Sequence, residues 1–153
     1  MRRLAKVAIG IAFICSMAST VLADEEADVQ NLVEKAVVFF QQKGQDYALR
    51  VLNLNSGPFR KGELYVFAGS MKDFTFLAHP ANAELLGKPQ KDMKDAVGKL
   101  IFQDFVNVAK DPGVGWVQYS WLRHAEKEPT PKMTYIKRIP GTDVFLGSGF
   151  YVK

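Results

Sequence analysis

Apolar residues first recur at the spacing of an α-helix. The acidic run that begins at Asp24 suits a helix N-terminus, where carboxylates meet the positive end of the helix dipole. It is followed by apolar positions three and four residues apart, namely Val29, Leu32, Val33, Ala36, Val37 and Phe40. This pattern predicts a long amphipathic helix from Asp24 onward. Apolar positions continue past Gly44, so the helix either runs on through this glycine or bends there into a second segment.

Beyond Gly62 the apolar period changes from that of a helix to that of a strand. Residues 64–68 place one set of apolar side chains on one face and Tyr65 and Phe67 on the other. After a turn over 69–73, residues 74–79 alternate in the same way, which predicts a β-hairpin. The proline- and glycine-containing segment 80–98 is predicted to be an irregular crossover with a short helical turn.

The second half of the chain predicts one more helix and three strands. An apolar helical face spans 101–109 and is stopped by Asp111-Pro112-Gly113. Strand alternation returns over 115–121, 132–138 and 144–152. This order of elements predicts an α+β domain in which two helices pack on one face of a five-stranded antiparallel sheet.

The first residues predict a secretory signal peptide. A basic start at Arg2, Arg3 and Lys6 precedes an apolar stretch over 7–17, and small residues at 21–23 provide a cleavage site. The apolar stretch is shorter than the roughly 20 residues that span a bilayer. We therefore expect residues 1–23 to be removed during Sec export, and residues 24–153 to form one periplasmic domain. The alternative is an uncleaved signal that anchors the domain to the inner membrane.

Charge and cysteine content narrow the class of function. The chain carries 20 basic and 16 acidic residues, but three of the basic residues belong to the predicted signal peptide, so the mature charge is nearly balanced. Proteins that bind nucleic acids normally carry a clustered basic surface, whereas the charges in this chain are interspersed, so nucleic acid is not an expected partner. The single cysteine, Cys15, leaves with the signal, and no disulfide framework is expected.

Six groups of short motifs follow one another in the order and spacing of single Cache extracytoplasmic sensor domains. They are Tyr65-Val66-Phe67, Ala78-His79-Pro80, Leu86-Gly87-Lys88 with Asp92 to Lys99, Gly115 to Trp121, Pro131 to Arg138, and Gly141 to Tyr151. From about Asp24 to its end, the chain resembles this family. The resemblance implies a PAS-like sheet with a long N-terminal helix. It also implies recognition of small extracellular molecules such as organic acids.

The resemblance also implies partners. Members of the family usually sit in chemoreceptors and sensor kinases, whereas this sequence ends directly after its last predicted strand. We therefore expect a stand-alone domain that binds a small-molecule ligand, a small carboxylate being favoured, and acts with a membrane receptor, kinase or transporter. The alternative is a structural protein without a ligand, whose long N-terminal helix forms a homodimer.

Eight residues are candidate ligand contacts. Aromatic side chains that are expected to wall a pocket are Tyr65, Phe67, Tyr119 and Trp121, with Phe102 from the helix side. The resemblance places Lys132 and Tyr135 near the ligand, and Lys132 would supply the cation for a carboxylate. Their odd spacing points them to opposite faces of a regular strand, so only a bulge would bring both to the ligand. His79 is a candidate donor. Each aromatic residue is equally compatible with an ordinary core position.

No catalytic residue, metal site or cofactor is predicted. The sequence contains no Gly-x-Ser-x-Gly elbow, no phosphate-binding loop and no cysteine nucleophile outside the predicted signal. Its two histidines, His79 and His124, lack the spacing of common zinc ligands. The expected class is therefore a binding domain and not an enzyme.

Overall fold

Within residues 15–123 and 126–152, which the computed structural model describes, the chain forms three α-helices, one 3-10 turn and seven strands. The basic start of the predicted signal peptide and His124 lie outside these residues. The helices are α1 (Cys15–Lys43), α2 (Gln45–Leu52), α3 (Ile101–Lys110) and the 3-10 turn η1 (Ala83–Leu85). The strands are β1 (Arg60–Lys61), β2 (Leu64–Tyr65), β3 (Phe67–Ser70), β4 (Thr75–Ala78), β5 (Val114–Leu122), β6 (Pro129–Arg138) and β7 (Val144–Tyr151). No described helix combines the length and apolar content that a membrane span requires.

The N-terminal helix stops before Gly44, which decides between the two predicted alternatives. Gly44 adopts a φ of 80°, a left-handed conformation that favours glycine, and its N–H donates to the carbonyl of Phe40 at 3.0 Å. α2 then turns back against α1. The start of α1 differs from the prediction, because the helix begins at Cys15 and runs through Asp24 and the predicted cleavage site.

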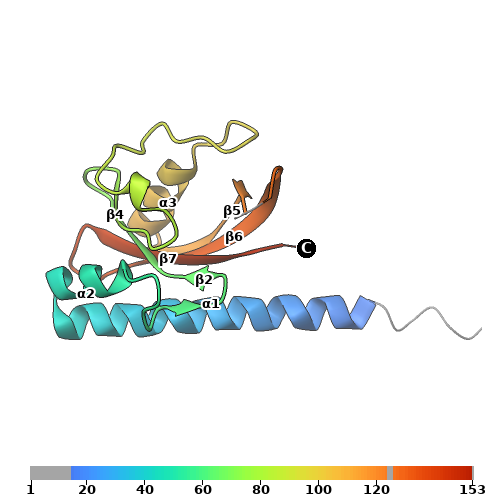
Figure 1. Cartoon of the computed structure of the whole chain (residues 1–153), viewed down its shortest axis with the longest axis horizontal. Helices are drawn as coiled ribbons and strands as arrows, with labels where there is room; N and C mark the ends of the chain where they lie inside the picture. The colour runs from blue at the N-terminus through green and yellow to red at the C-terminus, as the bar shows by residue number, and fades with distance from the viewer. Residues whose placement is uncertain (1–14, 124–125, 153) are drawn as a thin grey trace, which may run out of the picture.

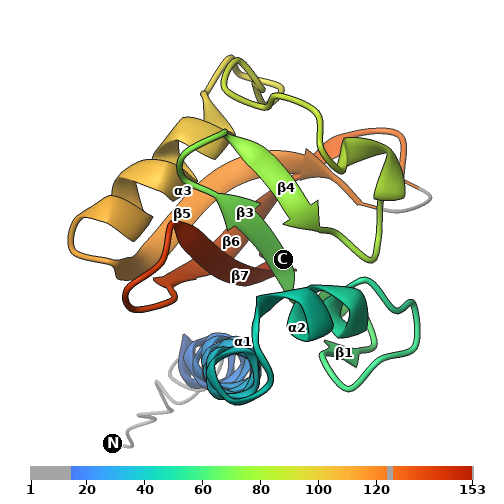
Figure 2. The same ribbon diagram turned by 90° about the vertical axis from the view of Figure 1, so that its left-hand side faces the viewer.

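A five-stranded antiparallel sheet in the order β4-β3-β7-β6-β5 forms the centre of the domain (Figure 1, Figure 2). The predicted α+β fold, with a hairpin of β3 and β4 and three C-terminal strands, is confirmed. β7 comes last in the sequence but lies at the centre, where it pairs with β3 and β6. β1 and β2 form a separate two-stranded antiparallel ribbon, termed the β1–β2 ribbon, which the sequence pattern did not predict.

The helices cover opposite faces of the sheet, so the prediction that both pack on one face is wrong. α1 and α2 cover one face, with a core that includes Val33, Val66 and Leu146, whereas α3 covers the other face together with Phe67 and Phe145 (Figure 1). Neighbours along β3 and β7 alternate between the two cores because successive strand side chains point to opposite faces. A sheet that is apolar on both faces needs a cover on each.

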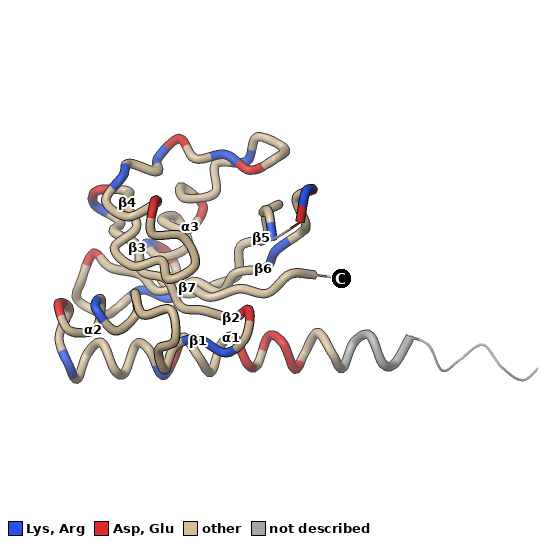
Figure 3. The backbone as a smooth tube through the Cα atoms, in the orientation of Figure 1, with Lys and Arg blue, Asp and Glu red and all other residues tan. Residues whose placement is uncertain are grey.

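The crossover between β4 and α3 is irregular with one helical turn, as predicted, and carries interspersed charges of both signs (Figure 3). Asp95 fastens it to the sheet. One carboxylate oxygen accepts the backbone N–H groups of Val97 (3.0 Å) and Lys99 (2.8 Å), and the other accepts that of Ser120 in β5 (3.1 Å). Although desolvation acts to raise the pKa of Asp95, these donors lower it.

Gly147 in β7 allows two large side chains to lie over the sheet. A Cβ atom at this position would lie 2.4 Å from Phe67 Cζ and 2.8 Å from Ile136 Cδ1. Both distances are shorter than van der Waals contact, so any side chain at this position displaces Phe67. The Phe67 ring in turn stacks on the ring of His79 with a centroid distance of 6.0 Å. The glycine thereby sets the position of a histidine at the end of the hairpin.

We predict that Gly147→Ala lowers the free energy of unfolding by about 1–3 kcal/mol, the usual cost of overpacking a core. Chemical denaturation measures this. The matched control is Ser148→Ala on the same strand. Ser148 Oγ is buried and has no hydrogen-bond partner among the described residues, so its removal is expected to leave stability unchanged or raised. Equal stability of Gly147→Ala and the wild type would contradict the close approach.

Candidate functional site

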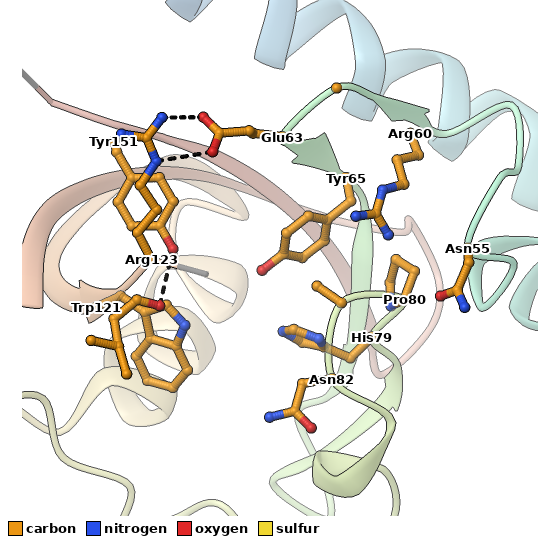
Figure 4. A pocket seen from close by; sticks show the side chains of 13 residues that line it. Asn55, Arg60, Glu63, Tyr65, His79, Pro80, Asn82, Trp121, Arg123 and Tyr151 are labelled. Carbon is orange, nitrogen blue, oxygen red and sulfur yellow. Dashed lines mark hydrogen bonds and ion pairs between the residues drawn. The ribbon is translucent and has the colours of Figure 1, made fainter. Parts of the chain in front are cut away.

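A cavity of about 790 Å³ opens at the edge of the sheet, between the β1–β2 ribbon, the loop that follows β4, and the ends of β5 and β7. Its lining residues are Asn55, Arg60, Gly62, Glu63, Tyr65, His79, Pro80, Ala81, Asn82, Trp121, Leu122, Arg123 and Tyr151. Figure 4 shows Trp121, Arg123 and Tyr151 on one wall and Tyr65, His79 and Asn82 on the facing wall. Its volume lies within the range that is typical of small-molecule pockets.

Lys132 does not itself line the cavity, but it contacts two aromatic residues that do. It pairs across the sheet with Tyr119 and Tyr151, and residues directly opposite one another in antiparallel strands share a face. Its ammonium nitrogen lies 4.8 Å from the Tyr151 ring centre and 5.0 Å from that of Tyr65, and donates to the Tyr65 hydroxyl at 3.4 Å. These contacts place a cation directly against two aromatic side chains of the cavity wall.

The burial of Lys132 changes its ionisation. Only 3% of the residue is exposed, and no carboxylate within the described residues forms an ion pair with it. Desolvation lowers the pKa of Lys132 to about 8, and the more distant charge of Glu63 opposes this shift. At neutral pH the side chain is therefore mostly a cation whose charge is poorly compensated.

His79 presents a neutral imidazole to the cavity. It is 6% exposed, and its ring packs against those of Tyr65 (5.2 Å between centroids) and Phe76 (5.1 Å). Desolvation, followed by the charge of Lys132, lowers the pKa of His79 to about 4. Its backbone N–H donates to Asn53 Oδ1 at 3.0 Å, which fixes the start of the loop, while its Nδ1 atom is buried without a partner in the described part of the chain.

A narrow apolar slot of about 10 Å³ lies deeper on the same face of the sheet. It is lined by Tyr65, Phe67, Phe76, His79, Met93, Ile101, Phe105, Tyr119 and Trp121. The Tyr119 hydroxyl, buried beside the slot, shares a hydrogen bond of 3.0 Å with Thr134 Oγ1, and desolvation raises the pKa of Tyr119 above its ordinary value. Of the predicted wall residues, Tyr65, His79 and Trp121 line both spaces, while Phe67 and Tyr119 line only the slot.

Phe102 and Tyr135, which were predicted to contact the ligand, line neither the cavity nor the slot. Phe102 is fully buried in the core under α3, with its ring centre 4.9 Å from that of Phe76. Tyr135 lies on the opposite face, where its hydroxyl donates to Glu34 of α1 at 3.3 Å. The register of β6 is regular from Lys132 to Tyr135, and no bulge turns both side chains to one face.

Four charged or aromatic residues of the cavity were absent from the sequence prediction: Arg60, Glu63, Arg123 and Tyr151. Glu63 of the β1–β2 ribbon forms a bidentate ion pair with Arg123 after the end of β5, in which Arg123 Nε lies 2.9 Å from Oε1. Hydrogen bonding to Glu63 raises the pKa of Arg123 above its ordinary value, and Arg123 also contacts Glu126 at 3.4 Å. This ion pair joins two cavity walls that lie far apart in the sequence, and no local motif predicts the pair.

We predict that Lys132→Met stabilises the unliganded protein at neutral pH. The folded-state pKa of Lys132 lies below its unfolded value, so the charged side chain costs stability below about pH 8, and this cost disappears as the pH rises through the unfolded pKa near 10.5. The expected gain at pH 7 is about 1–3 kcal/mol. Denaturation of wild type and variant between pH 6 and pH 10.5 measures the difference. A gain that does not shrink with pH would contradict desolvation of the ammonium as its cause.

Comparisons with known proteins agree with this architecture. A family model described as a Cache domain matches residues 34–153. The methyl-accepting chemotaxis protein McpP of Pseudomonas putida is 32% identical over 76 residues, which are 50% of this chain and 14% of that protein. The chain thus spans far less than the full length of this relative.

Solved structures of similar fold include three from chemosensory proteins. A Cache chemosensory domain studied for carboxylic acid recognition has a TM-score of 0.73 at 24% identity, covering 88% of this chain and 98% of that one. A periplasmic sensor domain of a chemotaxis protein has a TM-score of 0.66 at 26% identity, covering 94% and 100%. A methyl-accepting chemotaxis protein from Vibrio parahaemolyticus has a TM-score of 0.74 at 18% identity, covering 93% and 98%. Together with the match of the family model over most of the chain, they place this protein in the Cache domain family of sensor domains.

Proposed function

We propose that this Cache domain is an extracytoplasmic sensor that binds a small carboxylate in the cavity beside Lys132. The observation that carries the proposal is the buried ammonium of Lys132, which has no ion-pair partner in the described residues and contacts Tyr65 and Tyr151 of the cavity wall. A buried charge is costly unless it is compensated. An anionic ligand supplies this compensation.

The neighbouring groups suit the same ligand. The Tyr65 hydroxyl already accepts a hydrogen bond from Lys132, which leaves its proton available to a carboxylate oxygen. His79 is neutral at physiological pH and has one N–H to donate. Trp121 provides an apolar surface on the facing wall. These groups bind and orient an anion by hydrogen bonding, charge and packing, and the proposal includes no catalytic step.

The comparisons support this assignment at the level of the family. One structural neighbour recognises a carboxylic acid, and the relative from Pseudomonas putida is a chemotaxis receptor. We further propose that this chain is periplasmic, in agreement with its predicted signal peptide. In that compartment it acts with a membrane receptor, kinase or transporter. Intact-mass measurement of the exported protein decides whether residues 1–23 are removed or anchor the domain.

The direct experiment is a thermal-shift screen of the purified protein against organic acids, amino acids, amines and purines. A ligand that binds only the native state raises the melting temperature in proportion to the logarithm of its concentration above Kd. We expect carboxylates to raise it and neutral analogues of the same size, such as the corresponding amides, to leave it unchanged. A panel without any shift would favour the alternative of an interaction protein that has no ligand.

We predict that Lys132→Met weakens carboxylate binding by about 1.5–3 kcal/mol, the usual value of a charge-assisted hydrogen bond. Isothermal titration calorimetry measures the change. Lys137→Met is the matched control because Lys137 lies on the same strand but forms an ion pair with Glu34 on the opposite face. A second pair is Tyr65→Phe, which is expected to weaken binding, and Tyr135→Phe, which is not. Equal losses within either pair would reject the proposed site.

The ionisation of Lys132 predicts a pH dependence of affinity. The carboxylate binds the protonated ammonium, so affinity is constant below about pH 7 and declines as the pH rises through about 8, the pKa of Lys132 in the free protein. Well above pH 8, the affinity is expected to fall about tenfold per pH unit. Lys132→Met is expected to abolish this slope in the same range. Affinity that stays constant from pH 7 to pH 10 would show that Lys132 is not a ligand contact.

A further inference from the structure

Arg60 is a second cation at the cavity. It belongs to β1 of the β1–β2 ribbon, it is half-buried, and it lines the cavity. Figure 4 shows its guanidinium group beside the Tyr65 ring and above Pro80. None of the residues that the structure describes forms an ion pair or a hydrogen bond with this side chain. An arginine in this position offers a planar set of donors that matches a carboxylate.

The other charges near the cavity are arranged differently. Arg123 is compensated by two carboxylates, those of Glu63 and Glu126. Lys61, the neighbour of Arg60 in β1, points away from the cavity and forms an ion pair with Asp28 of α1 at 2.8 Å. Of the four cations named at or near the cavity, Arg60 and the buried Lys132 form no ion pair within the part of the chain that the structure describes.

These two cations lie at different positions along Tyr65. The ammonium of Lys132 contacts the Tyr65 hydroxyl at 3.4 Å, whereas the Arg60 guanidinium lies beside the ring, and the hydroxyl points away from it (Figure 4). A single carboxylate carries both of its oxygens on one carbon and engages one of these positions at a time. A single ligand that contacts both cations therefore needs two anionic groups joined by a short chain. The cavity volume of about 790 Å³ accommodates such a molecule.

We propose that the ligand is a short aliphatic dicarboxylate, with one carboxylate at Lys132 and Tyr65 and the other at Arg60. This inference rests on the proposed function of the cavity as a carboxylate site and names the class of ligand. Arg60 is the residue that distinguishes a dicarboxylate from a monocarboxylate. Its planar donors favour a bidentate contact, and the distance between the two cations selects the length of the connecting chain.

The experiment is isothermal titration of the purified protein with malonate, succinate and glutarate, and with butyrate, which has the carbon number of succinate but only one carboxylate. We expect the best dicarboxylate to bind at least about tenfold more tightly than butyrate, the value of one additional charge-assisted contact. Arg60→Gln is expected to weaken the best dicarboxylate by about tenfold and butyrate by less, which removes the preference. Lys132→Met is expected to weaken both classes.

Lys61→Gln is the matched control, since it removes a cation from the adjacent position of the same strand without touching the cavity. It is expected to preserve the preference for dicarboxylates. If butyrate binds as tightly as every dicarboxylate, the dicarboxylate inference is overturned while the carboxylate site stands. If no carboxylate binds, both fail. If Arg60→Gln does not fold, Arg60→Lys is the second variant, because it keeps the charge but loses the planar donors. It is expected to reduce the preference for dicarboxylates. A preference equal to that of the wild type would overturn the role of Arg60.

Discussion

The alternation of side chains along a sheet that is buried on both faces governs the rest of this structure. β7 lies at the centre of the sheet, and its residues belong in turn to the core under α1 and to the core under α3. The strands paired with β7 show the same alternation between the two cores. Lys132 and Tyr151 therefore share the face that leads to the cavity, whereas Tyr135, three residues after Lys132, is committed to α1. A slip of one residue in β6 would exchange the contents of the two faces.

The proposed binding site occupies the region where the core under α3 ends. Further along the same face, Phe67, Phe102 and Phe145 pack against one another beneath the helix. At the cavity the side chains become amphipathic, and a lysine takes the place that an apolar residue would fill in a stable core. The buried charge lowers stability, and the two apolar cores offset this cost. An anion bound at the cavity would therefore remove a cost in stability that the folded domain carries without a ligand.

Most of the fold could be read from local periodicity, because helices and strands impose different spacings on apolar residues. The helix before Gly44, the hairpin and the three last strands were all visible in this way. The side of the sheet that each helix covers could not be predicted in this way, because a strand such as β7 is apolar on both faces and does not indicate which helix covers which face. The two-residue strands of the β1–β2 ribbon are too short to show a period. Arg60 and Glu63 were missed for that reason, whereas neighbouring motifs made Lys132 and His79 candidates.

The β1–β2 ribbon contacts three separate parts of the domain. Arg60 and Lys61 are consecutive residues of one strand, and the first faces the cavity while the second is bonded to Asp28 of α1. Both contacts come from adjacent positions of the same strand, so the cavity wall and the attachment to the long helix are neighbours in the chain. Glu63 adds a third attachment on the far wall, through Arg123. A single short ribbon therefore connects the cavity wall, the long helix and the far wall, although these three parts lie far apart in the sequence.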